Sequence, residues 1–338
     1  MAKKLFDFAI GNPPYMDTTE SDSTRMPPVY HIFMDAAYQA AEKTELITPA
    51  RFLFNAGYTP KEWNEKMLND PHFKVLSYET DASKIFPNTE IKGGVAITYH
   101  DSNMSYGAIG TFTKYPELNS ILKKVKGVSS RFLNSIISSP LSFKVSPLML
   151  KEHPNTVGRL RSSAFTNLAE IFYDKAPDDG LSYIVMIGLL HGKRVEKYVR
   201  RDYIVDSSGT LDKYTLLVAK ANGAGHFGET LSSPVIAKPG VAYTQTFIAI
   251  GKFDNISEAE NVQKYVKSKF ARAMLGVLKI TQDCPGPKWA YVPLQDFSSS
   301  SDINWDDTIA AIDRQLYRKY NLSVDEIAFI ENNVKEME

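Results

Sequence analysis

The sequence predicts an α/β protein with a mainly parallel sheet in its first part and a mixed α+β, β-rich region after it. Strand and helix patterns alternate over about the first hundred residues. Short runs rich in β-branched and aromatic residues, separated by turns, occur between Leu181 and Phe253. A chain of 338 residues is long enough for two domains. We place them at residues 1–115 and 116–338.

The first region begins with a short apolar strand, Leu5–Ile10, that ends at Gly11-Asn12-Pro13-Pro14. Apolar residues at helical spacing then predict a helix from Tyr30 to Ala41. Leu46-Ile47 indicates a second strand. Thr59-Pro60-Lys61-Glu62 predicts the start of a second helix, with the threonine as N-cap and the glutamate completing a capping box.

Two further strands are predicted at Lys74–Tyr78 and, after Gly93-Gly94, at Val95–Tyr99. The repeated order of strand and helix favours parallel pairing. The last two strands are too close in sequence for a helical crossover. We therefore expect them to form an antiparallel pair at the edge of the sheet.

In the second region, strand patterns come first along the chain and helix patterns come last. Its strands are expected at Tyr183–Leu190, Tyr203–Val205, Tyr214–Val218, Val235–Ala237 and Thr246–Ile250. One helix is expected at Glu258–Leu278. Helical spacing at Ile309, Ile312 and Leu316, and a capping box at Ser323-Val324-Asp325-Glu326, predict a helical end.

Composition excludes several classes of protein. The single cysteine, Cys284, excludes a disulfide framework and a cysteine-based zinc site. The six histidines show no metal-ligand spacing, so we expect no metal. Neither a signal peptide nor a membrane-spanning run is recognisable. We therefore expect a cytoplasmic protein without a membrane partner.

The formal net charge is zero, but its distribution is uneven. The run KRVEKYVRR from Lys193 to Arg201 contains five basic residues and one acid. Such a run suits contacts with nucleic-acid phosphates, and a solvated surface strand or helix explains it equally well. The candidate DNA contacts are Lys193, Arg194, Lys197, Arg200, Arg201, Lys220 and Lys238.

The motif that carries chemistry is Asn12-Pro13-Pro14-Tyr15, directly after the first strand. Two prolines stiffen the backbone and remove two N–H donors. The Asn12 amide oxygen and the Pro13 carbonyl are therefore fixed acceptors, and Tyr15 offers an aromatic face. In an open α/β sheet this position binds ligands. Two acceptors and a stacking platform suit the exocyclic amine of a planar base that has left its duplex.

The segment FDFAIGNPPY resembles motif IV of the N6-adenine DNA methyltransferases. Glu45–Pro49 resembles the strand that comes after motif IV in that family, and Phe86-Pro87 with Gly93–Ile97 resembles their motif VIII region. The resemblance implies an incomplete class I (Rossmann-like) methyltransferase sheet. It also implies catalytic roles for Asn12, Pro13, Pro14 and Tyr15, and an aromatic contact of Phe86 with the base; a plain core position is the other interpretation of Phe86.

Later segments resemble the target-recognition domain of Eco57I-like restriction-modification methylases. The similarity implies site-specific methylation of adenine in double-stranded DNA, with S-adenosylmethionine as methyl donor. The segments are Lys220–Gly223, Gly228-Glu229, Pro234–Lys238, Thr244–Phe247, Tyr265–Phe270, Lys279–Asp283, Val292–Phe297 and Gln315–Tyr317.

Only eleven residues precede Asn12, too few for the glycine-rich strand, turn and helix that bind the cofactor in this family. Gly223-Ala224-Gly225 lacks the context of a dinucleotide loop, and we interpret it as a loop of the recognition domain. The expected S-adenosylmethionine site is thus incomplete. A separate or upstream N-terminal methyltransferase half is an expected partner.

Three alternatives remain open. Protein glutamine N5- and RNA adenine methyltransferases use the same four-residue motif. Asp81, Glu90 and Lys92 mimic the acidic and lysine pattern of a Mg²⁺-dependent nuclease. A DNA-recognition module without catalysis of its own is the third.

Overall fold

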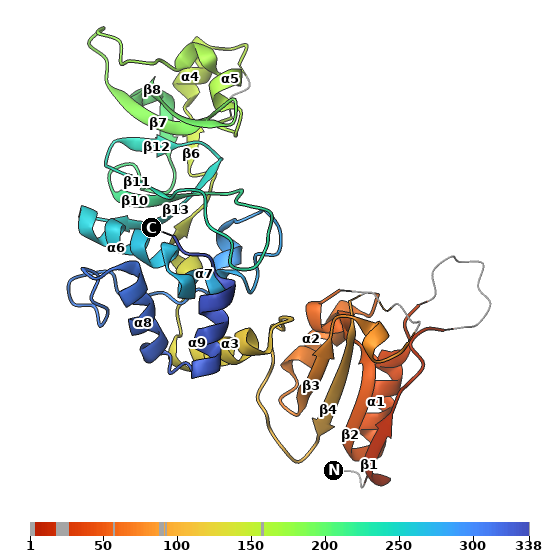
Figure 1. The fold of residues 1–338 in the computed structure, drawn as a ribbon. Helices are drawn as coiled ribbons and strands as arrows, with labels where there is room; N and C mark the ends of the chain where they lie inside the picture. The colour runs from red at the N-terminus through yellow and green to blue at the C-terminus, as the bar shows by residue number, and fades with distance from the viewer. Residues whose placement is uncertain are drawn as a thin grey trace. The chain divides into compact units, whose positions relative to one another are not determined.

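The computed structural model describes residues 4–17, 27–56, 58–87, 91, 93–156 and 159–337. The chain divides into two compact units, unit 1 (Met1–Asn119) and unit 2 (Ser120–Glu338) (Figure 1). Within the described ranges, no helix is both long enough and apolar enough to cross a membrane.

Unit 1 is a four-stranded sheet in the order β1-β2-β4-β3, with helices between the strands. β1 and β2 are parallel, and β4 is antiparallel to both of its neighbours. The elements are β1 (Phe6–Gly11), α1 (Tyr30–Ala40), β2 (Ala41–Pro49), η1 (Ala50–Phe54), α2 (Lys61–Asn69), β3 (Phe73–Glu79), η2 (Ala82–Lys84) and β4 (Val95–Asp101).

The four predicted strands and two predicted helices of this region are present. The mainly parallel sheet is wrong, because β4 lies between β2 and β3 and pairs antiparallel with both, which makes the sheet mixed. The antiparallel pairing of the last two strands is confirmed, with β4 inserted inside the sheet and β3 at its edge. The predicted capping box of α2 is wrong. Pro60 is the N-cap, and the Thr59 hydroxyl donates to the Asn64 side chain instead, at 2.7 Å.

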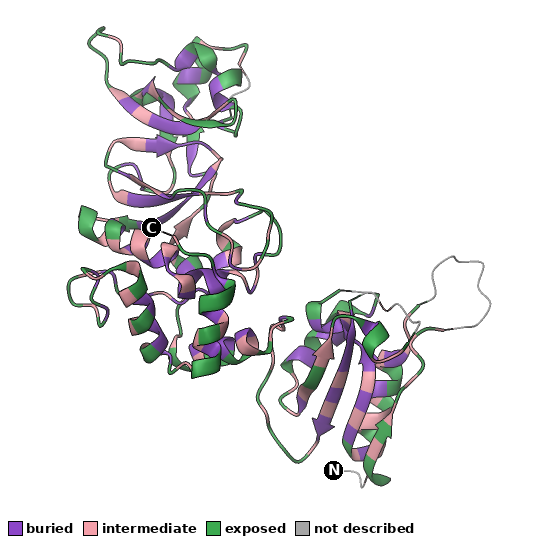
Figure 2. Cartoon of the chain, viewed as in Figure 1, coloured by how far each residue is buried: buried purple, intermediate pink, exposed green. Residues whose placement is uncertain are grey.

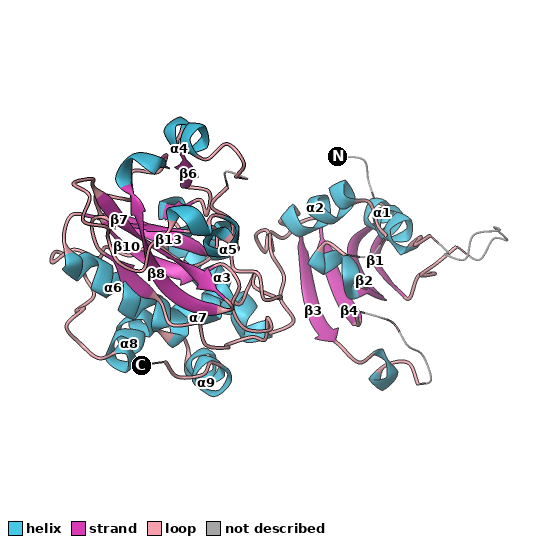
Figure 3. Cartoon of the chain, turned by 90° about the horizontal axis from the view of Figure 1, so that it is seen from above, coloured by secondary structure: helices cyan, strands magenta, loops and turns pink. Residues whose placement is uncertain are grey.

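The core of unit 1 lies between the sheet and its two helices, which Figure 3 shows on the same side of the strands. Tyr30 and Met34 of α1 meet Trp63 and Met67 of α2 above Phe52 of η1. The Trp63 ring lies 5.2 Å from the Phe52 ring, centroid to centroid. Each such side chain contributes about 1.5–3 kcal/mol by leaving water. The helices are therefore held to this one face.

The opposite face of β1 is exposed, as Figure 2 shows. Phe6, Phe8 and Ile10 alternate along the strand, so they share a face, and they are 60%, 43% and 77% exposed. The Phe8 ring lies near that of Tyr99, whose neighbour His100 stacks on Tyr38 of α1. Since neighbouring strand residues point to opposite faces, the exposed row faces away from α1. Contiguous apolar patches on a protein surface are typical of interaction sites.

A tight turn at Gly93-Gly94, directly before β4, forms hydrogen bonds with the ends of β2 and β3. The Ala50 N–H donates to the Gly94 carbonyl at 3.0 Å, and the Tyr78 hydroxyl donates to the Gly93 carbonyl at 3.2 Å. Gly94 has a φ of +78°, and an added Cβ would lie 2.3 Å from the Glu79 carbonyl oxygen. Only glycine fits there, for both reasons.

Replacing Gly94 with alanine should therefore destabilise the protein more than replacing Gly107. Gly107 has nearly the same φ, +79°, but no atom lies within 4 Å of an added Cβ. Gly107→Ala should cost about 1 kcal/mol from backbone strain alone. Gly94→Ala should cost at least twice that because backbone must move. Urea denaturation of both variants measures the difference, and equal losses would show that the contact is unimportant.

Unit 2 combines short sheets with helices. Its sheets have the strand orders β11-β10-β13-β5, β12-β7-β8 and β6-β9. The remaining elements are α3 (Pro116–Val128), η3 (Leu133–Ile136), β5 (Ile137–Ser138), β6 (Phe143–Val145), α4 (Pro147–Glu152), α5 (Ala164–Asn167), η4 (Ala169–Ile171), β7 (Tyr183–Leu190), β8 (Lys193–Arg200), η5 (Arg201–Tyr203), β9 (Ile204–Asp206), β10 (Tyr214–Ala219), β11 (Val235–Ala237), β12 (Val241–Tyr243), β13 (Phe247–Phe253), α6 (Ile256–Lys267), α7 (Lys269–Leu275), η6 (Gly286–Trp289), α8 (Ile309–Lys319) and α9 (Val324–Asn333).

The strands predicted for this region are present, with ends shifted by a few residues. The long helix predicted at Glu258–Leu278 is wrong, because the helix breaks at Ser268. The Ser268 hydroxyl accepts the Ala271 N–H at 3.1 Å and so caps a second helix, α7. The capping box at Ser323 and Glu326 is confirmed as the start of α9.

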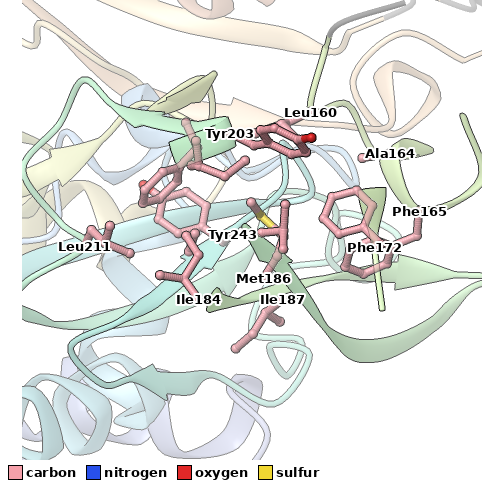
Figure 4. Close-up of a cluster of buried hydrophobic side chains, with 14 of the residues drawn as sticks. Leu160, Ala164, Phe165, Phe172, Ile184, Met186, Ile187, Tyr203, Leu211 and Tyr243 are labelled. Carbon is pink, nitrogen blue, oxygen red and sulfur yellow. The ribbon is translucent and has the colours of Figure 1, made fainter. Parts of the chain in front are cut away.

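One apolar cluster holds the β7–β8 hairpin to the rest of unit 2 (Figure 4). Phe165 and Phe172 pack edge to face with their centroids 4.8 Å apart. Met186 and Ile187 are neighbours on β7 and are both buried, so the strand is covered on its two faces. The hairpin is therefore a rigid base for the residues at its ends.

Candidate functional site

The candidate site lies in unit 1, where the carboxyl ends of β1, β2 and β3 are found. β1 is parallel to β2, and β3 runs in the same direction because β4 is antiparallel to both β2 and β3. The segments that come after these three strands therefore all leave the sheet on the same side, at the carboxyl ends of the strands. They begin at Asn12, Ala50 and Thr80. Carboxyl ends of strands form ligand sites in open α/β sheets.

Asn12 and Pro13 place two hydrogen-bond acceptors here, the Asn12 amide oxygen and the Pro13 carbonyl. The Asn12 side chain is exposed, and no other described residue forms a hydrogen bond with it. The Pro13 carbonyl likewise receives no backbone N–H from the described part of the chain. Neither Pro13 nor Pro14 has an N–H of its own. The Asn12 amide oxygen and the Pro13 carbonyl can therefore accept hydrogen bonds from a ligand. The two prolines offer the ligand no backbone N–H donor.

Tyr15 is fixed beside these acceptors. Its carbonyl accepts the Val29 N–H at 3.1 Å, and its ring packs against the core of unit 1. Its hydroxyl is buried and has no hydrogen-bond partner among the described residues. Burial raises the pKa of this phenol to about 12. The ring is thus held by its packing against the core and by the backbone hydrogen bond to Val29, not by its hydroxyl.

The structure brings Phe86 to Tyr15 from 71 positions later in the sequence. Their ring centroids lie 6.5 Å apart with an interplanar angle of 70°. The Phe86 N–H donates to the Ala82 carbonyl at 2.8 Å. Asp81 holds the same turn by accepting the Ser83 N–H at 3.1 Å. The two aromatic residues expected to contact a base are therefore neighbours, and their roles remain predictions.

Changing Tyr15 to phenylalanine should leave the free energy of unfolding unchanged or raise it, because a buried hydroxyl without a partner is unfavourable. Changing Tyr15 to alanine should lower it by about 2 kcal/mol, since the ring loses its packing against the core. Urea denaturation of the two variants makes the comparison. A loss above about 1 kcal/mol in Tyr15→Phe would mean that the hydroxyl is bonded after all.

The described residues do not form a cofactor site beside Asn12. β1 is the outermost strand of its sheet, and no described segment pairs with its outer side. Gly223-Ala224-Gly225 lies in unit 2, where the N–H groups of Ala224 and Gly225 donate to the Glu229 carboxylate. These residues therefore do not fit S-adenosylmethionine.

No group of three or more metal-ligating side chains occurs in the described part of the chain. In the nuclease-like pattern, Glu90 and Lys92 lie outside the described residues. Asp81 itself accepts hydrogen bonds from the Ser83 backbone and hydroxyl, which hold the pKa of its carboxyl below the usual value.

The candidate DNA contacts do not form one surface. In the β7–β8 hairpin, Lys193 pairs with Leu190 at one end and Arg200 pairs with Tyr183 at the other. Seven residues of strand separate these ends by roughly 23 Å. Lys238 precedes β12, which begins opposite Val185, so it lies toward the Arg200 end.

Several of these cations already have partners. Arg200 contacts Glu152 at 2.8 Å and Asp202 at 2.7 Å, and Lys197 pairs with Asp174. Arg201 donates to the Ile204 carbonyl, and Arg194 donates to the Ser233 carbonyl at 2.8 Å. Lys193, Lys220 and Lys238 form no ion pair within the described ranges. The sequence therefore suggests more unpaired positive charge than these residues carry in the structure.

Sequence reasoning missed two exposed cations, Arg159 and Arg161. The residue between them, Leu160, accepts the Gln245 N–H at 3.0 Å through its carbonyl. Gln245 lies beside Thr246, to which the Lys220 backbone is bonded. A contact between residues this far apart in sequence leaves no local signal.

Residues 1–86 match the model of the Eco57I restriction-modification methylase family. The match confirms a resemblance to restriction-modification methylases for that part of the chain, and adenine-N6 specificity and the target-recognition domain stay predictions. No curated protein matches. The chain is similar to the solved structure of the type IIG restriction endonuclease BpuSI, with 9% identity and a TM-score of 0.34, over 91% of this chain and 48% of that one. It is also similar to the type IIL restriction-modification enzyme MmeI in complex with DNA, with 10% identity and a TM-score of 0.36, over 96% and 56%. The chain spans about half the length of these two structures.

Proposed function

We propose that this chain is part of a site-specific DNA methyltransferase that modifies adenine at N6 within a restriction-modification system. The position of Asn12–Tyr15 at the carboxyl end of β1, inside the segment that matches a restriction-modification methylase family, supports this most. Residues 1–115 then form the C-terminal part of a class I catalytic domain. Residues 116–338 form the DNA target-recognition domain.

In this proposal the motif binds the amine of a flipped adenine. The Asn12 amide oxygen and the Pro13 carbonyl accept its two N–H bonds, which directs the nitrogen lone pair away from the protein wall. Tyr15 and Phe86 form an edge-to-face pair whose surface can support the base. Stacking would offset part of the cost of leaving the duplex, about a few kcal/mol. All four groups are neutral, which suits an uncharged amine.

The methyl donor that the family implies is S-adenosylmethionine. Because the described residues do not fit it, we propose that a second methyltransferase half supplies that site. In the described part of the chain no strand pairs with the outer edge of β1, and Phe6, Phe8 and Ile10 expose an apolar row beside it. Such an edge pairs readily with a further strand. The partner half belongs either to the same polypeptide or to a separate one.

The chain by itself should bind S-adenosylmethionine weakly or not at all, since one wall of the cofactor site is absent from the described residues. Isothermal titration of the cofactor into the isolated chain measures this directly. Micromolar binding would contradict the proposal that a second half holds the cofactor.

Asn12→Ala should abolish adenine methylation when the chain is assayed together with its cofactor-binding half, because the amine loses an acceptor. Binding to duplex DNA should be unchanged. Asn69→Ala, an exposed asparagine at the end of α2, is the matched control and should keep full activity. Detection of N6-methyladenine in treated plasmid is the measurement.

Retained methylation in Asn12→Ala would remove the assigned role. Methylation of RNA or of a protein glutamine in place of DNA would favour the related methyltransferases. DNA binding without methylation by the complete assembly would leave a DNA-recognition module. No described strand pairs with the outer side of β1, and this observation keeps the last function as the second candidate.

A further inference from the structure

At one end of the β7–β8 hairpin, segments of unit 2 that are far apart in sequence meet. The Arg194 guanidinium donates to Ser233, and the Lys220 N–H donates to the Thr246 carbonyl at 2.8 Å. The Asn222 N–H donates to the Gln282 carbonyl at 2.8 Å. We name this surface the loop end, and it consists of residues 159–161, 193–194, 220–226, 232–233, 244–246 and 279–283.

The loop end carries an excess of positive charge in a chain whose net charge is zero. It has one exposed acid, Asp283. Uncharged polar side chains lie exposed among the cations, at Ser232, Ser233, Thr281 and Gln282. Its exposed or half-buried cations are Arg159, Arg161, Lys193, Arg194 and Lys220. This charge balance complements a polyanion.

A buried ion pair lies beneath two of the loops. The Glu229 carboxylate accepts the N–H groups of Ala224 at 2.9 Å and Gly225 at 3.0 Å. The same carboxylate pairs with the Lys279 ammonium, which also donates to the Thr281 carbonyl at 3.2 Å. The Lys279 side chain is 4% exposed and that of Glu229 is 14% exposed. One pair of charges therefore holds both loops.

The two loops are pressed together at Gly225. This residue has a φ of +92°, and an added Cβ would lie 2.4 Å from the Thr281 Cα. Burial alone would raise the pKa of the Glu229 carboxyl. The Lys279 ammonium and the N–H groups of Ala224 and Gly225 outweigh it and hold that pKa below its usual value. The Glu229 carboxylate therefore stays charged at neutral pH.

A buried ion pair is a poor way to gain stability, because desolvating both charges offsets most of their attraction. Apolar side chains of similar volume would serve a core at least as well. This pair instead fixes the geometry of two loops whose tips carry exposed polar groups. Its position indicates that the surface formed by these loops must keep a defined shape.

We propose that the loop end is the surface through which this chain contacts duplex DNA, and that Glu229 and Lys279 are positioning residues for its two loops. The proposal rests on the proposed function, which requires a DNA-binding region. The cations contact phosphates, and the uncharged loop tips contact base edges. The opposite end of the hairpin, with Arg200, Arg201 and Lys238, lies outside the contact.

Salt dependence of binding tests the surface. The full chain is titrated onto a labelled random-sequence duplex at several KCl concentrations. Arg161→Ala, Lys193→Ala and Lys220→Ala should each weaken binding and make the slope of log K against log[salt] shallower by about 0.9. Lys238→Ala is the matched lysine at the other end and should change neither.

The reverse pattern, with Lys238→Ala effective and the loop-end variants silent, overturns this inference while leaving the proposed function intact. A wild-type chain that binds no duplex at low salt overturns the DNA partner of the proposed function, and this inference with it.

Selection from a random duplex pool tests the positioning role. The variant Glu229→Gln with Lys279→Met removes both charges together, so neither is left buried alone. It should keep the wild-type salt slope but lose at least tenfold in enrichment of the sequence that the wild type selects. The exposed pair Lys213–Asp254, changed to methionine and asparagine, is the control and should select as the wild type does.

Gln282→Ala, at an exposed loop tip, should change the selected sequence without touching the buried pair, and it keeps the test decisive if the double variant does not fold. Wild-type selection by either of these loop variants would overturn the assigned roles of the loops.

Discussion

The parallel pairing of β1 with β2 is the constraint on which the candidate site depends. Because of this pairing, the segment after β1 leaves the sheet on the same side as the segments that come after β2 and β3. Antiparallel pairing would have placed Asn12 at the far edge, away from Phe86. The insertion of β4 keeps β3 in the same direction as β2. Tyr15 and Phe86, which lie 71 positions apart in the sequence, therefore meet as an aromatic pair next to Asn12-Pro13.

Local signals in the sequence predicted the parts of the fold that local physics decides. The capping box at Ser323 was predicted correctly because both of its hydrogen bonds lie within one turn of helix. The break at Ser268 was missed, since the apolar spacing of α6 and α7 continues across it. The serine cap and the carboxylate of Asp313, which accepts the N–H groups of Lys269 and Phe270, decide where α7 begins. The second of these contacts comes from α8 and has no local signature.

The same distinction separates the two candidate sites. Asn12–Tyr15 is a contiguous motif whose chemistry depends on residue type and the preceding strand, so the sequence could indicate it. Lys193–Arg201 is also contiguous, but most of it forms a strand, so the two ends of the segment lie roughly 23 Å apart. Different residues surround each end. Acids from α4 and η5 compensate Arg200, whereas distant loops bring Arg159 and Arg161 toward the other end. Pairing and register, which tertiary structure sets, decide which charges are free.

The glycine-rich segment at residues 223–225 shows how tertiary contacts change the meaning of a motif. Successive N–H groups in such a loop form a concavity for an anion, and by sequence alone that anion could be a phosphate. In the structure it is the carboxylate of Glu229, which is in turn held by Lys279. An internal carboxylate cannot dissociate, so the loop is kept in one shape whether or not a ligand is present. The concavity is thereby removed from binding, and the outer surface of the loop, beside Lys220 and Gln282, is the part left to meet a partner.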